Sequence, residues 1–375
     1  MYMPHKTQSH AASAHIVIDA RIINSSTGRY VERLLTNLEK LNSPHRFTIL
    51  VPSADKDYWQ PTSTNFTVTV ADFANYSFAE QLGFKRFLDT LNADLVHFCM
   101  PQQPVLYKGT TVTTVHDLNQ LRLTEVDDMP VVVLRAKQRV LKWLLQRVAR
   151  QTAHVITPSE YTKRDFIELT EIDESKVTVT YEAADALSDK PRTVTRLHNI
   201  PFILYVGRAE PYKNNRNLIR AHQLLLSKFP DLQLIIVGKK DTFRERDIAW
   251  VGEQGYKNVV FYGFADNAEL AWMYEHCKAY VFPSFMEGFG LPGLEAMQHG
   301  APVVSSDATS LPEIYGNAAL YFDAHNHGDI AAKLELVLSD EKIATKLRTR
   351  GNLCYKKYSW RRMAEQTLAI YNEAL

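Results

Sequence analysis

The chain has 375 residues, of which 43 are Lys or Arg and 42 are Asp or Glu, so its formal net charge is only +1. This balance argues against binding nucleic acid through overall charge, and no apolar run reaches the about 18 residues that a membrane-spanning helix needs. The length exceeds that of a typical single domain and predicts two domains of roughly 150 to 200 residues each.

The ends of the chain and its cysteines indicate where the protein resides. Residues 1–14 lack the apolar centre of a signal peptide and are predicted to be a flexible segment. Cys99, Cys277 and Cys354 lie far apart and form neither a CxxC pair nor a disulfide framework. We therefore expect a cytoplasmic protein that is soluble or lies at the inner face of the membrane.

Short apolar runs separated by longer segments recur along the first half and are typical of buried parallel strands. They cover residues 15–19, 47–51, 93–98, 110–115 and 154–157. A helix is predicted over residues 29–41, between the first two runs.

The polar stretch 186–200 interrupts this pattern, and strands are predicted again after it. They cover residues 202–207, 232–238, 258–263, 279–284 and 301–306, with helices over 217–229 and 266–277 between them. Alternating strands and helices predict two Rossmann-like α/β domains facing across a cleft. We assign residues 15–190 to the first domain and 191–359 to the second, followed by a helix over 360–375.

Two acids, Glu287 and Glu295, are eight positions apart in a glycine-rich stretch that follows a predicted strand. Open α/β sheets bind ligands at the carboxyl ends of their strands. Gly288 and Gly290 allow the backbone to approach a ligand, and each carboxylate can accept hydrogen bonds from a diol. The pair therefore suits the ribose and the hexose of a nucleotide sugar, although two solvated glutamates are the simpler alternative.

Two cations, Arg208 and Lys213, lie five positions apart in a loop between a predicted strand and a predicted helix. Together they can neutralise a diphosphate and stabilise the charge that grows on a departing nucleoside diphosphate. The alternative is that either one is an ordinary surface cation.

These motifs together resemble a known family. VGRAEPYKN (206–214), followed by PSFMEGFGLPGLEAMQHGAPVVSSD (283–307), closely resembles the second domain of family 4 retaining glycosyltransferases of the GT-B fold. The similarity continues through SLPEIYGNAALYFD (310–323) and the final helix, so it covers most of residues 201–375. It implies that the final helix crosses back onto the first domain, whereas periodicity alone favours packing on the last domain.

The resemblance also implies the role of each residue in the second domain. Arg208 and Lys213 would bind the diphosphate, Glu295 the ribose, and Glu287 would face the transferred sugar near its anomeric carbon. Further donor contacts are implied for Gly288, Phe289, Gly290 and Leu291 beside the sugar, and for Gly238, Lys239 and Phe264 beside the base.

In the first domain, INSSTGRY (23–30) is similar to a glycine-rich family loop that meets the diphosphate and the acceptor. Only Gly28, before Arg29 and Tyr30, is kept, and a lone glycine before a helix is equally typical of a simple turn. His116 follows a predicted strand and by itself favours a structural role. The resemblance instead implies a catalytic His116 close to the donor sugar and the β-phosphate.

Two further segments have alternative interpretations. DKD at 55–57 matches a metal-binding DxD only over three residues in a surface turn, so we expect neither a metal nor a cofactor. Segment 134–151 contains six basic residues and no acid. It either lies on an anionic bilayer or packs one apolar stripe on the domain with its cations in water. The basic residues are Arg135, Lys137, Arg139, Lys142, Arg147 and Arg150.

The resemblance implies a retaining, metal-independent hexosyltransferase. It would move a mannose- or glucose-type sugar from a UDP- or GDP-sugar to a hydroxyl of a glycan, a lipid-linked or a small-molecule acceptor. A sugar phosphorylase, an epimerase and a catalytically silent nucleotide-sugar-binding protein are the alternatives. A nicotinamide dehydrogenase is disfavoured because no complete GxGxxG follows either first strand.

Overall fold

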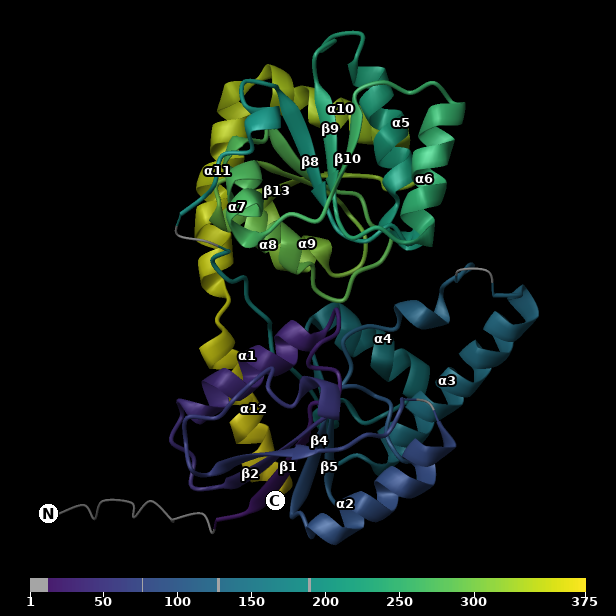
Figure 1. Cartoon of the computed structure of the whole chain (residues 1–375), viewed down its shortest axis with the longest axis vertical. Helices are drawn as coiled ribbons and strands as arrows, with labels where there is room; N and C mark the ends of the chain where they lie inside the picture. The colour runs from purple at the N-terminus through teal and green to yellow at the C-terminus, as the bar shows by residue number, and fades with distance from the viewer. Residues whose placement is uncertain (1–12, 76, 127–128, 188–189) are drawn as a thin grey trace, which may run out of the picture.

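The structure is a computed structural model that describes residues 13–75, 77–126, 129–187 and 190–375. Two α/β domains are stacked along the long axis of the molecule (Figure 1). Of the segment predicted to be flexible, residues 1–12 lie outside the described residues.

The N-terminal domain contains a seven-stranded sheet in the order β3-β2-β1-β4-β5-β6-β7, and every pairing is parallel. The strands are β1 His15–Asp19, β2 Arg46–Val51, β3 Phe66–Val70, β4 Leu95–Phe98, β5 Thr111–Thr114, β6 His154–Thr157 and β7 Val177–Val179. Helices α1 Gly28–Glu39, α2 Lys85–Leu91, α3 Val131–Gln151 and α4 Glu160–Thr170 lie between them.

The C-terminal domain repeats this plan with a six-stranded parallel sheet in the order β10-β9-β8-β11-β12-β13. The strands are β8 Phe202–Val206, β9 Gln233–Val237, β10 Val259–Gly263, β11 Ala279–Phe282, β12 Val303–Ser306 and β13 Ala319–Phe322. The helices are α5 Asn215–Leu225, α6 Thr242–Glu253, α7 Asn267–His276, α8 Leu291–Gln298, α9 Leu311–Tyr315, α10 His327–Ser339 and α11 Glu341–Cys354. The predicted pair of Rossmann-like domains is confirmed, while the domain boundary at residue 190 stays a prediction.

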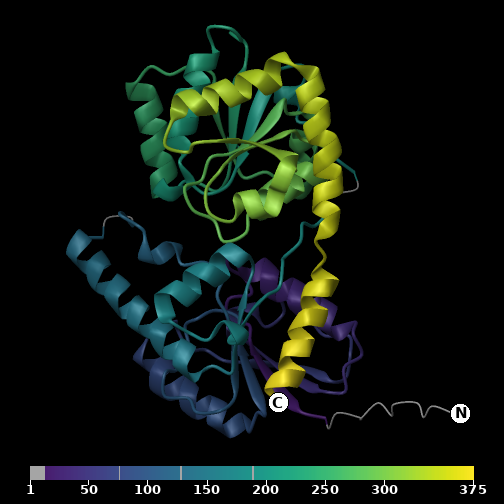
Figure 2. The same ribbon diagram turned by 180° about the vertical axis from the view of Figure 1, so that it is seen from behind.

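The last helix, α12 (Trp360–Ala374), leaves the C-terminal domain and packs on the N-terminal one (Figures 1 and 2). Trp360, Met363, Ile370 and Tyr371 are buried in the same apolar cluster as residues of β1 and α1. This confirms the crossover that the family resemblance implies, and the expectation from periodicity alone is wrong. The helix ties the two domains together on the side away from α3.

A buried histidine makes the stability of the contact between α12 and the N-terminal domain depend on pH. His97 of β4 is inaccessible to solvent, and its ring nitrogens lie 2.6 Å from the Tyr371 hydroxyl and 2.8 Å from Thr114 Oγ1. Burial, with a smaller contribution from nearby His116, lowers the pKa of His97 from 6.5 to about 3. The unfolded chain therefore binds a proton below pH 6.5 that the folded protein does not bind until about pH 3.

We expect the free energy of unfolding to fall by about 2 kcal/mol between pH 6.5 and pH 5 through His97 alone. Urea titrations at each pH measure the free energy of unfolding. In His97→Gln its fall between pH 6.5 and pH 5 should be smaller by about 2 kcal/mol, whereas His198→Gln, at an exposed histidine, should leave the fall unchanged. The same fall in His97→Gln as in the unaltered chain would contradict the prediction.

Candidate active site

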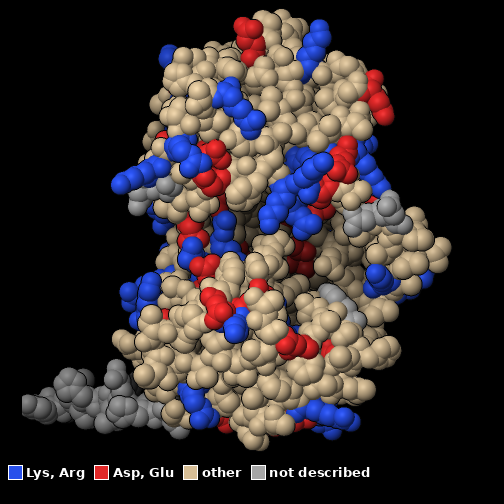
Figure 3. All heavy atoms as spheres, in the orientation of Figure 1, with Lys and Arg blue, Asp and Glu red and all other residues tan. Residues whose placement is uncertain are grey.

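The carboxyl ends of the two sheets face each other, since Ser159 after β6 donates to the carbonyl of Gly288 after β11. A hollow with acidic side chains lies between the domains (Figure 3). On the C-terminal side, β11 leads into a loop that carries Glu287 and then into α8. Gly290 caps α8 with φ +101°, and a Cβ there would lie 2.5 Å from the Tyr315 hydroxyl oxygen. Only glycine fits this turn, because other residues rarely adopt such a φ.

Glu287 forms an ion pair with Lys213, whose Nζ lies 2.7 Å from Glu287 Oε1. The two side chains are only 11% and 16% exposed, respectively. Burial lowers the pKa of Lys213, but the adjacent Glu287 carboxylate outweighs this effect and raises it above its ordinary value. Lys213 is therefore a permanent cation beside the predicted sugar-facing acid.

The backbone of Glu287 is fixed by a later loop. Its N–H donates to Thr309 Oγ1 at 2.9 Å, and its carbonyl accepts from the hydroxyls of Thr309 at 3.0 Å and Ser310 at 2.9 Å. Thr309 has φ +55°, a strained conformation for a β-branched residue. The sequence did not predict a role for either hydroxyl residue, because their only signal is their position in the loop between β12 and α9.

Arg208 lies apart from this ion pair. Its side chain is 59% exposed, and Nε lies 2.7 Å from Glu210 Oε1. The structure thus places Arg208 in the predicted loop but pairs it with an acid that sequence reasoning did not single out.

Glu295 lies in α8 and points toward the N-terminal domain. It is only 3% exposed and accepts a hydrogen bond from Arg29 at the start of α1. Burial raises the pKa of Glu295, and Arg29 opposes this shift. The structure therefore joins Glu295, which was predicted to bind ribose, to Arg29 of the predicted diphosphate or acceptor loop. This ion pair connects the two domains.

Gly288 lies where the backbones of the two domains come close together. Its carbonyl accepts from Ser159 Oγ at 2.7 Å, and a Cβ at Gly288 would lie 2.1 Å from the carbonyl oxygen of His116. Ser159 also accepts from the Thr162 N–H, which confirms it as the cap of α4. Glu313 accepts from two further N–H groups at the start of this helix, those of Glu160 and Tyr161. Sequence reasoning missed this second interdomain cap.

His116 is held in place by residues of the N-terminal domain. Its Nε2 donates to the Cys99 carbonyl at 3.0 Å, and Nδ1 lies 3.4 Å from Glu182 Oε1. The Tyr30 ring packs edge-on against the imidazole, with the ring centres 4.7 Å apart. Gly28 is required at the start of α1, because a Cβ there would lie 1.9 Å from the Ile23 carbonyl oxygen.

The remaining predicted donor residues lie around the carboxyl ends of β9, β10 and β11. Gly238 is tightly packed, since a Cβ would lie 2.1 Å from the Gly207 carbonyl oxygen. Lys239 is exposed and Phe264 is 71% exposed, so both can meet a ligand. The Phe289 side chain is buried and Leu291 is partly buried, which leaves mainly backbone for donor contacts there.

Within residues 13–75, 77–126, 129–187 and 190–375, no group of three or more His, Cys, Asp or Glu side chains is arranged to hold a metal ion. In the same ranges, no helix is both long and apolar enough to cross a bilayer. The expected independence from metals stays a prediction.

Known proteins resemble this chain in sequence and in structure. The family described as Glycosyltransferase Family 4 matches residues 27–188, and Glycosyl transferases group 1 matches residues 189–353. The O-antigen chain mannosyltransferase B of Escherichia coli is 30% identical over 275 residues, which cover 69% of each chain.

Among solved structures, sucrose-phosphate synthase from Thermosynechococcus elongatus aligns over 96% of this chain and 98% of its own, with a TM-score of 0.77 and 18% identity. Anabaena HepE, solved in complex with UDP-glucose, aligns over 96% of this chain and 100% of its own, with a TM-score of 0.72 and 15% identity.

The paired parallel sheets and the structural neighbours show the GT-B fold. The two family matches and the E. coli relative show more specifically that the chain belongs to glycosyltransferase family 4.

Proposed function

We propose that the protein transfers mannose, with retention of anomeric configuration and without a metal, from a nucleoside diphosphate mannose to a hydroxyl of a glycan acceptor. The name of the E. coli relative supports mannose and a glycan product. The UDP-glucose complex of HepE supports a nucleotide sugar as donor. The observation that carries the proposal is the Lys213–Glu287 ion pair at the carboxyl edge of the C-terminal sheet.

In this proposal the C-terminal domain binds the donor. Lys213 and Arg208 bind the diphosphate, since both cations come from the loop after β8. The backbone of the Gly288–Gly290 turn binds the sugar hydroxyls, and Glu295 binds the ribose. The N-terminal domain binds the acceptor, with His116 at the edge of the cleft.

The reaction forms a bond from the acceptor oxygen to the anomeric carbon while the bond from that carbon to the diphosphate breaks. The acceptor proton passes to the departing diphosphate on the same face of the sugar. Lys213 and Arg208 stabilise the charge that grows on this leaving group. Glu287 stabilises the positive charge that develops on the sugar ring.

The purified chain, incubated with GDP-mannose, UDP-glucose or UDP-mannose and a mannose-terminated glycan, tests the proposal. We expect release of nucleoside diphosphate with a mannose donor, together with an extended glycan whose new linkage has the configuration of the donor by NMR. Phosphate-dependent release of mannose 1-phosphate would instead indicate a phosphorylase. Thermal stabilisation by the donor without transfer would indicate a silent binding protein.

A further inference from the structure

Helix α3 has two apolar faces. Leu134, Leu144, Leu145 and Val148 pack on the domain, as an ordinary amphipathic helix requires. A second set points away from the domain and is exposed: Val132 by 81%, Val140 by 65% and Trp143 by 55%. We call this second set, together with the exposed cations Arg139, Lys142 and Arg150 around it, the outer face of α3.

The outer face is strongly basic. Arg139, Lys142 and Arg150 are exposed, and the helix contains no Asp or Glu. Among the described residues, none of these three cations has an ion-pair partner. Packing on the N-terminal domain therefore explains one side of α3 and leaves the apolar and cationic residues of the other side unexplained.

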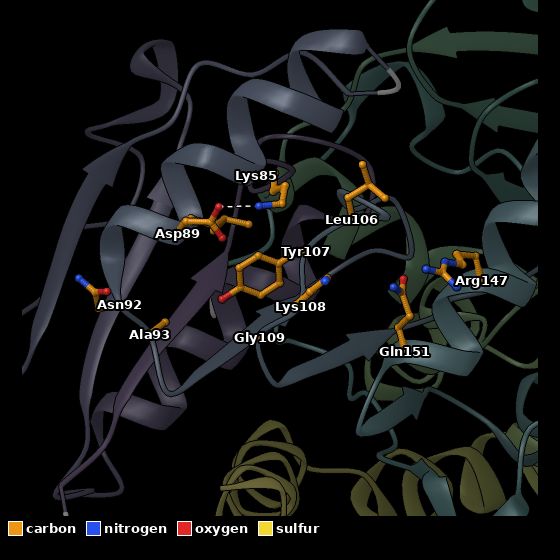
Figure 4. A pocket seen from close by; sticks show the side chains of 11 residues that line it. Lys85, Asp89, Asn92, Ala93, Leu106, Tyr107, Lys108, Gly109, Arg147 and Gln151 are labelled. Carbon is orange, nitrogen blue, oxygen red and sulfur yellow. Dashed lines mark hydrogen bonds and ion pairs between the residues drawn. The ribbon is translucent and has the colours of Figure 1, made fainter.

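A cavity of about 660 Å³ adjoins the C-terminal end of α3. Arg147 and Gln151 of α3 line it together with Lys85, Lys108 and the half-exposed Leu106 (Figure 4). Its one acid, Asp89, is paired with Lys85 at 2.6 Å. The cavity thus adds two cations, Arg147 and Lys108, that no described carboxylate neutralises.

We propose that the outer face of α3 docks the N-terminal domain on a bilayer rich in anionic lipid, with a headgroup phosphate in the adjoining cavity. A helix with apolar side chains between Lys and Arg matches the boundary between acyl chains and anionic headgroups. A neutral glycan offers neither an apolar phase nor negative charge, and nucleic acid offers no apolar phase. Charge complementarity and the apolar stripe therefore select a lipid surface.

The position of α3 connects this surface to the cleft. The helix lies at the outer edge of the N-terminal domain (Figures 1 and 2). Six residues before α3, Glu125 Oε1 lies 2.7 Å from Arg246 Nη1 of α6 in the C-terminal domain. A bilayer under α3 would therefore lie beside the cleft between the domains, where a lipid-linked acceptor can enter.

Sedimentation of the full chain with vesicles of phosphatidylcholine, with and without phosphatidylglycerol, tests the proposal in the absence of any donor. We expect binding only to the anionic vesicles. Arg139→Glu/Lys142→Glu should weaken it about twenty-five-fold or more, because each Lys or Arg near an anionic surface contributes about fivefold. The control Lys342→Glu/Lys346→Glu carries the same charge change at exposed sites of α11 and should retain binding.

A second pair of variants tests how much the apolar side chains contribute to vesicle binding. Val140→Ser/Trp143→Ser should weaken vesicle binding at least tenfold, whereas Leu224→Ser/Leu353→Ser, at residues 52% and 64% exposed on the C-terminal domain, should not. Brominated lipid should quench the fluorescence of the unaltered chain more than that of Trp143→Phe. Absence of vesicle binding, or equal losses in the matched pairs, would overturn the proposal. The proposal would also be overturned if the outer-face variants still bound vesicles but no longer bound a glycan or protein ligand that the unaltered chain and the control variants bind.

Discussion

Replacing Glu287 by Gln is expected to lower kcat by on the order of a hundredfold or more, the scale of losing one preorganised electrostatic contact. The amide keeps the shape of the side chain and the hydrogen bonds from Thr309 and Ser310 to the backbone carbonyl. It removes the negative charge that we assign to the developing positive charge on the sugar. Single-turnover measurements with saturating donor report this chemical step directly.

The same substitution has a second effect that must be separated from the first. Lys213 is only 16% exposed and has its carboxylate partner at 2.7 Å, so Glu287→Gln removes the ion-pair partner of a mostly buried ammonium. We expect a loss of about 1–3 kcal/mol in the free energy of unfolding. Urea denaturation measures it.

The double variant Glu287→Gln/Lys213→Met distinguishes the two effects. Removing both charges should restore most of the stability, because an apolar pair replaces a broken ion pair. It should not restore turnover, since both proposed catalytic charges are then absent. Full turnover in Glu287→Gln, or recovery of turnover along with stability in the double variant, would remove Glu287 from the mechanism.

Local sequence predicted the strand-to-helix turn that carries Glu287. A buried apolar strand, two glycines and a proline at the start of a helix determine this turn within about ten residues, so their pattern is readable. Strands β3, β7 and β13 were not predicted, because they lack such a pattern. Strand β3 is a partly exposed edge strand, and β7 has only three residues. Strand β13 is likewise only half buried in its centre.

The partners of the site residues could not be read from the sequence in the same way. Arg29 and Glu295 are 266 positions apart, and Ser159 and Gly288 are 129 apart. Which pairs form depends on how the two domains meet, and no local periodicity encodes that arrangement. The positions of the motifs could therefore be predicted from the sequence, whereas the ion pair between Glu295 and Arg29 could not.

Replacing Glu295 by Gln is expected to weaken donor binding by roughly tenfold to a hundredfold, because hydrogen bonds to a charged group contribute about 1.5–3 kcal/mol. The effect should appear in the Kd and leave kcat nearly unchanged, since the ribose is remote from the breaking bond. Burial raises the pKa of Glu295, so an uncharged amide is compatible with the folded site. Calorimetric titration with GDP and UDP measures the affinity.

A structural role for Glu295 predicts a different pattern. If the acid only holds Arg29 across the domains, Arg29→Gln and Glu295→Gln should weaken nucleotide binding equally. If it binds the ribose, Glu295→Gln should weaken binding more than Arg29→Gln. In addition, a 2′,3′-dideoxynucleotide should bind the unaltered protein more weakly than GDP or UDP but bind Glu295→Gln about as well as the natural nucleotide. The carboxylate has two oxygens and Arg29 contacts one of them, so ribose can bind the other or displace Arg29. A nucleotide that keeps its affinity after losing both hydroxyls would assign Glu295 to the domain contact alone.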